Sequence, residues 1–151
     1  MTDTNKTILQ ALGSGLAGAV ALNVLHETVR QFVDEAPRAD LLGERTIKKV
    51  LNKIDVEPPS GDELYGWTMA SDLVSNALYY SLVGLAEPKH ALLTGTVLGL
   101  AAGAGAVGLP GPMGLGTAPT SRTQATAVMT VGWYLVGGLV AAGVYSLLKR
   151  W

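Results

Sequence analysis

Four apolar stretches dominate this sequence, and each is long enough to cross a lipid bilayer as a helix. A helix rises about 1.5 Å per residue, so a hydrocarbon layer of about 30 Å needs about 20 apolar residues. The stretches predict membrane-spanning helices at about residues 7–30, 64–86, 89–109 and 125–148. We therefore expect the 151 residues to form one membrane domain, residues 1–151, with all-α structure.

The second and third stretches are joined by only three residues, Glu-Pro-Lys at 87–89. Residues 67–86 contain one charged side chain, Asp72, and residues 91–109 contain none. So short a link favours an antiparallel pair of helices, and proline is well accommodated at the start of the second one. The pattern thus predicts an antiparallel four-transmembrane-helix bundle organised around this pair.

The distribution of charge supports a membrane protein. Only 15% of the residues are charged, compared with about 25% in soluble domains. Of the 23 charged residues, 14 lie between Arg30 and Glu63, which leaves the apolar stretches almost free of charge. Nineteen glycines and a single phenylalanine suit close helix packing better than an aromatic soluble core.

Several classes of function are disfavoured. A net charge of -1 offers no basic surface for nucleic acid, and without cysteine there is no thiolate metal site or thiol nucleophile. His26 and His90 belong to opposite sides of the predicted membrane and cannot share a haem. Ser75, His26 and Asp72 could be drawn as a triad, but no nucleophile elbow is present. We expect no metal, no cofactor and no enzyme activity.

The one hydrophilic segment, residues 31–66, separates the first two predicted spans. Within it an amphipathic helix is expected at about residues 41–54, with a basic face opposite a stripe of Ile47, Val50, Leu51 and Ile54. Such a helix typically lies in the membrane interface. Covering the mouth of the bundle and contacting a partner subunit are the alternatives. Ser60 to Glu63 then has the pattern of a capping box opening the next helix.

Glycines at four-residue spacing predict where the helices pack. In lipid the hydrophobic effect does not drive helices together, so small residues that let two backbones approach are the usual contact points. The residues expected at such contacts are Gly15, Gly18, Gly95, Gly99, Gly103 and Gly138. The same glycine-rich faces could also bind other subunits.

A polar cluster is predicted between the first two spans. One helical stripe holds Asn23, His26, Glu27 and Arg30, and a second holds Asp72, Ser75, Asn76 and Tyr79. Both follow i, i+3, i+4, i+7 spacing and lie at similar depth from the same membrane side, so they can face each other. Two interpretations stay open: a hydrogen-bonded seam that locks the helices together, or a small polar cavity.

The sequence favours a membrane protein that acts by association. We expect an accessory or scaffold subunit of a membrane complex, or a homo-oligomer, with the lipid bilayer and other membrane subunits as partners. The alternative is a small transporter or channel that handles a proton, an ion or a polar headgroup at the polar cluster. Seven Lys and Arg residues on the loop side against four on the other favour cytoplasmic loops and outward termini, in a bacterial-type inner membrane.

Overall fold

The computed structural model describes residues 3–150, and these residues form helices and connecting loops without any strand. The long helices are α1 (Asp3–Val29), α3 (Gly61–Tyr80), α4 (Ala91–Gly108) and α6 (Gln124–Leu148). Shorter elements are α2 (Ala39–Lys53), α5 (Ala118–Ser121) and the two 3-10 turns η1 (Ser81–Leu85) and η2 (Pro88–His90). The all-α prediction is confirmed.

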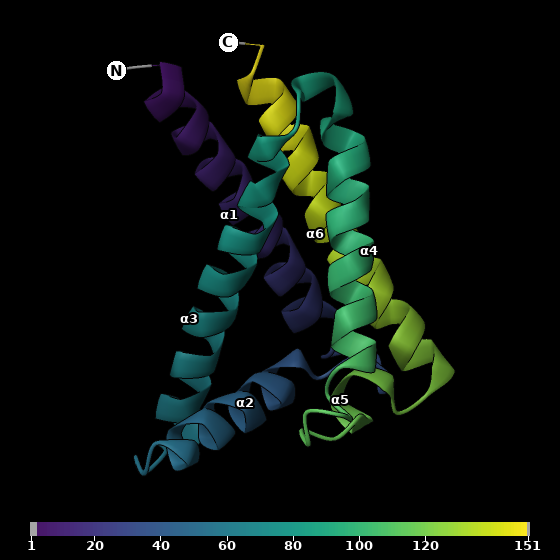
Figure 1. The fold of residues 1–151 in the computed structure, drawn as a ribbon. Helices are drawn as coiled ribbons and strands as arrows, with labels where there is room; N and C mark the ends of the chain where they lie inside the picture. Colours follow the sequence, from purple (N-terminus) through teal and green to yellow (C-terminus); the bar gives the residue numbers. More distant parts are fainter. Residues whose placement is uncertain (1–2, 151) are drawn as a thin grey trace.

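The four long helices are splayed (Figure 1). α6 packs against both α1 and α4, and α3 packs along the other side of α1. From the turn that joins them, α3 and α4 run apart, so they are well separated where α2 lies across the end of the molecule (Figure 1). The start of α1 and the end of α6 lie together at the opposite end. α2 therefore lies across the separated ends of α3 and α4 (Figure 1).

Three segments are long and apolar enough to cross a membrane: Thr4–Val29, Pro88–Gly108 and Gln124–Leu148. They coincide with three of the four predicted spans. At most a third of each is buried inside the protein. Their outward side chains are large and apolar, as a lipid-facing surface requires. α3 does not reach the same apolarity, because Asp62, Glu63 and Asp72 lie within it.

The amphipathic helix is present as α2, and it is fixed at both of its sides. Gly43 lies against the methyl group of Thr68 on α3. On the other side, Arg45 donates a hydrogen bond of 2.8 Å to the Leu115 backbone oxygen, and Lys49 donates to that of Met113. Two of its basic residues thus hold the segment of residues 109–117 between α4 and α5, here called the Gly/Pro loop.

The capping box predicted at Ser60 does not form. Ser60 is the residue before α3, but its side chain makes no capping hydrogen bond. The first helical residue is Gly61 with φ of +57°, a left-handed conformation that glycine adopts without strain. The glycine therefore makes the sharp turn into α3, and the serine side chain is not needed for it.

Each of the six glycines expected at helix contacts faces another helix of the same chain. A side chain at Gly15 would collide with the backbone of α3 and η1. At Gly18 it would meet α6, and at Gly95, Gly99 and Gly103 it would meet the backbone of α6. Gly138 is the reciprocal contact on α6. These faces are thus occupied within the chain itself.

We expect Gly99→Ala to destabilise the protein by about 1–3 kcal/mol, the usual cost of overpacking. The added Cβ would lie 2.6 Å from Leu135 Cα, so the backbones of α4 and α6 would have to separate. Gly105→Ala on the same helix is the matched control, because there the nearest atom is a flexible Leu109 methyl at 3.5 Å. That variant should gain up to about 1 kcal/mol from helix propensity. Thermal unfolding in detergent measures the stability of both variants. Equal changes in stability would contradict the close contact between α4 and α6 at Gly99.

Candidate functional site

Arg30, directly after α1, joins three helices. Its guanidinium lies 2.7 Å from Glu27 Oε2 on α1 and 2.7 Å from Asp40 Oδ2 on α2. It also donates to the Tyr65 hydroxyl of α3 at 3.3 Å, and this hydroxyl donates to Glu27 at 3.0 Å. A planar guanidinium can serve several acceptors in fixed directions. The arginine therefore fixes how α1, α2 and α3 meet.

Asp40 is the buried carboxylate of this ionic network. Its side chain is 5% exposed and is also held by Arg38, whose Nη2 lies 2.7 Å from Oδ2 and whose Nε donates to Oδ1 at 2.9 Å. Burial raises the pKa of Asp40, but the hydrogen bond from Arg38 and the positive charges of Arg38 and Arg30 outweigh it. The pKa of Asp40 therefore lies below its ordinary value, and the same contact raises that of Arg38.

A second set of polar contacts lies deeper, between α1 and α3. Asn23 Nδ2 donates to Asp72 Oδ2 at 2.9 Å and to the Ala19 backbone oxygen at 3.1 Å. Ser75 is exposed and donates to the backbone oxygen of its own helix at Asp72. Asn76 is buried. Tyr79 instead reaches α4, where it donates to the Leu98 oxygen at 2.9 Å.

The structure thus brings together part of the predicted cluster. Glu27 pairs with Arg30, and Asn23 with Asp72, each within or between the predicted stripes. Ser75 and Tyr79 point elsewhere. Sequence reasoning missed Asp40, Arg38, Thr68 and Tyr65 as members of the site. The Arg-x-Asp spacing at the start of α2 was a local signal for Asp40, whereas nothing in the sequence marks Thr68.

His26 is buried, with 7% of its surface exposed, and it makes no ion pair with the neighbouring carboxylates. Its ring lies against two aromatic side chains of α6, with centroids 4.7 Å from Trp133 and 6.1 Å from Tyr134. Among the described residues its Nε2 atom has no hydrogen-bond partner. The buried hydroxyl of Thr68 on α3 has none either.

Both of these side chains line a small, partly enclosed cavity between α1, α2 and α3. Its volume is about 10 Å³, and its remaining walls are Asn23, Glu27, Ala39, Asp40, Met69 and Asp72. This is about the space that one water molecule needs. Buried polar atoms without partners are costly, about 1–3 kcal/mol each, so a polar occupant here is favoured.

A wider cleft of about 280 Å³ adjoins this cavity. It lies between α2, α3 and α6, and it shares Ala39, Thr68 and Asp72 with the cavity walls. Polar side chains continue along it at Thr46, Ser71 and Ser75. Ala39, Thr68 and Asp72 therefore lie at the boundary between the cavity and this cleft.

Within residues 3–150 no group of three or more His, Asp and Glu side chains is arranged to hold a metal ion. Comparison with protein-family models, with curated proteins and with solved structures gives no match. What the site can do chemically is therefore inferred from its own residues.

We expect Asp40→Asn to destabilise the protein at neutral pH by about 1.5–3 kcal/mol, the range for a hydrogen bond to a charged group. The change removes the negative charge between Arg30 and Arg38. Asp34→Asn is the control, because Asp34 is exposed and does not contact this network. Chemical unfolding in detergent measures the free energy of both variants.

The pH dependence of the wild-type protein should follow from the same carboxylate. Its folded pKa lies below the ordinary value of 3.8, so its contribution is present above that value and is lost as the pH falls further. Below about pH 4 the stability difference between wild type and Asp40→Asn should shrink. A difference that stays constant down to pH 2 would contradict this role of Asp40.

Proposed function

We propose that the chain is a four-span integral membrane protein in which α3 together with η1 forms the fourth span. α3 packs against α1 and runs from the end at α2 to the turn that leads into α4 (Figure 1). Asp62 and Glu63 belong to its first turn, at the end occupied by α2. Asp72 is then the one charged side chain inside this span, and its hydrogen bond to Asn23 lowers the cost of placing it there.

The orientation follows from this arrangement. Four spans put both chain ends on one side, in agreement with the common end of α1 and α6 in Figure 1. α2 and the Gly/Pro loop then lie on the other side, which carries seven of the 11 Lys and Arg residues. By the positive-inside rule this side is cytoplasmic, and we place the protein in a bacterial-type inner membrane.

We propose further that the protein is a small transporter that carries a proton through the cavity of His26, Thr68 and Asp72. The observation that supports this is a pair of buried polar atoms without partners in the described structure, His26 Nε2 and Thr68 Oγ1, on two residues that line the same small cavity. A purely structural seam would satisfy its polar groups by direct hydrogen bonds. A cavity of about 10 Å³ admits one water molecule and excludes larger ligands, so a proton is the favoured cargo.

Two hollows adjoin the site: the cleft beside α2, and one between α1 and α3 that shares Asn23 and Met69 with the cavity walls. Towards the side opposite α2, the buried hydroxyl of Tyr80 donates to the Tyr134 oxygen at 2.7 Å, and that of Tyr145 lies 3.3 Å from the Gly84 oxygen. Both side chains are buried within apolar clusters. Proton release to the other side would therefore require a change in how α3 packs on α1 and α6. An open pore is not favoured by this geometry.

We expect Asp72→Asn to abolish pH-driven proton flux while the protein stays folded. An amide can keep the hydrogen bond to Asn23 but cannot exchange a proton. Ser81→Ala, in η1 of the same proposed span, is the control, because its hydroxyl bonds to the Leu78 backbone oxygen and lies outside the cavity and its adjoining cleft. Proteoliposomes with an entrapped pH-sensitive dye measure the flux. Wild-type flux no greater than that of empty vesicles would contradict the transporter.

Thr68→Val adds a second readout to this test. It keeps the shape of the side chain and removes the unpartnered hydroxyl, so the folded protein should gain about 1–3 kcal/mol of stability. Loss of flux together with this gain separates a role in transport from a role in folding. A variant that is stabilised and transports at the wild-type rate would exclude Thr68 from the proton route.

The accessory or scaffold role is the second candidate, and it now depends on different glycines. The six glycines first expected to support association pack within the chain. Gly13, Gly132 and Gly143 have open space where a side chain would lie, and they are on the spanning helices α1 and α6. Small residues open to the outside on such helices allow close approach of a partner helix.

For this second candidate we expect Gly132→Leu to weaken assembly without unfolding the chain, because a Cβ at this position has no atom of the described chain within 4 Å. Native mass spectrometry of protein extracted in mild detergent measures the assembly, and thermal unfolding checks the fold. Co-purified subunits or a homo-oligomer should be lost in the variant. A wild-type protein that is a lone monomer would remove the association proposal.

A further inference from the structure

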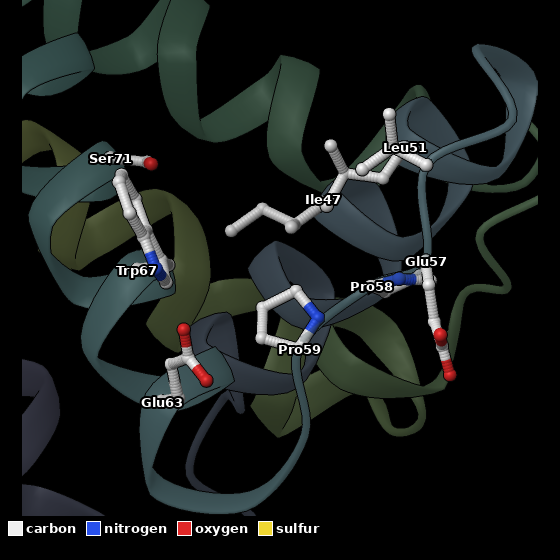
Figure 2. A pocket seen from close by; sticks show the side chains of 9 residues that line it. Ile47, Leu51, Glu57, Pro58, Pro59, Glu63, Trp67 and Ser71 are labelled. Atoms are coloured by element: carbon white, nitrogen blue, oxygen red, sulfur yellow. The ribbon is translucent and has the colours of Figure 1, made fainter.

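A larger groove lies on the outer side of the α2–α3 junction (Figure 2). Its volume is about 540 Å³, within the range of small-molecule sites. Its walls are Ile47, Leu51, Val56, Glu57, Pro58, Pro59, Glu63, Trp67 and Ser71. Most of this surface is apolar, and it is contributed by α2, by the proline-containing linker and by the first turns of α3.

The charged side chains that line the groove are both acidic. In Figure 2 the carboxylate of Glu63 is directed towards the indole of Trp67 across from Pro59, and Glu57 lies at the far rim. Neither glutamate forms an ion pair within the described part of the chain. The Trp67 side chain is 60% exposed. A carboxylate beside an accessible aromatic face attracts an ammonium group, by charge and by cation–π attraction.

In the described part of the chain no basic residue forms an ion pair with this rim. Arg45 and Lys49 of α2 are bonded to backbone oxygens of the Gly/Pro loop. The groove thus combines a negative rim with an apolar floor at Ile47 and Leu51. Its complement is an amphiphile with a positively charged head and an aliphatic chain. An anionic lipid would meet repulsion from Glu57 and Glu63.

We infer that this groove binds a phospholipid whose headgroup carries an ammonium group, as in phosphatidylethanolamine. The ammonium lies between Glu63 and Trp67, and the upper part of an acyl chain lies on Ile47 and Leu51. The inference rests on the proposed membrane placement, which puts the α2–α3 junction at the boundary between lipid and water. It does not depend on the proton route, since Asp72 and His26 do not line this groove.

Competition between two lipids tests the inference. The purified full chain is delipidated in detergent, incubated with equal amounts of phosphatidylethanolamine and phosphatidylglycerol of identical chains, and analysed by native mass spectrometry. We expect one retained phosphatidylethanolamine. Glu63→Gln should lower the preference for it at least about tenfold, because a charge-assisted hydrogen bond is lost. Asp62→Asn, the adjacent residue outside the groove, should keep the preference. Equal retention of both lipids by the wild type would overturn the inference.

A second variant and a soluble competitor separate the remaining outcomes. Trp67→Leu keeps an apolar wall but removes the aromatic face, so the preference should fall while the melting temperature is maintained. If soluble phosphoethanolamine displaces the lipid at equal concentration, the occupant is a water-soluble amine and the lipid assignment is wrong. Failure of the membrane placement would be seen separately, as protein that stays in the aqueous phase during detergent phase separation.

Discussion

The structure depends on the direct contact between helix backbones at glycine. α6 is central to it: Gly138 lies against the backbone of α4 at Gly95 and Gly99, and Gly137 lies against α1 at Gly18. In lipid, such contacts gain packing and dispersion energy where apolar side chains alone give no preference for another helix. Because α1 and α4 are both held by α6, α3 contacts mainly α1, and the separation of α3 from α4 follows from this order.

Arg30 then fixes the position of α2, which lies across the separated ends of α3 and α4. It holds the start of α2 through Asp40, and α2 in turn holds the Gly/Pro loop. α2 crosses the end of the long helices, and its residues Ala39 and Asp40 form part of the wall of the His26 cavity. This ionic network therefore positions the helices and does not react. The lowered pKa of Asp40 agrees with this, because it keeps the carboxylate charged and paired with Arg30 and Arg38. The polar groups that remain unpaired lie just beyond this network.

Periodicity predicted the helices well because helix length and apolarity are local properties. Of the two polar stripes expected to face each other, Asn23 and Asp72 form a direct hydrogen bond. Tyr79, on the second stripe, has a long side chain that reaches the backbone of α4 instead. Thr68 could not be identified from the sequence, because the burial of its hydroxyl without a hydrogen-bond partner depends on how α2 packs on α3. The Ser60 cap failed because Gly61 supplies the turn by its backbone alone.

The contrast between Asn23 and His26, three residues apart on one helix, supports the proposal of a functional site over a purely structural seam. The Asn23 amide donates its hydrogen bond to Asp72, so the polar groups of this part of the α1–α3 interface are paired. The His26 ring is held by Trp133 and Tyr134, and its Nε2 atom is left without a partner in the described structure. A buried imidazole with one nitrogen left unpartnered costs stability, and the proposed proton route is a physical reason to keep it.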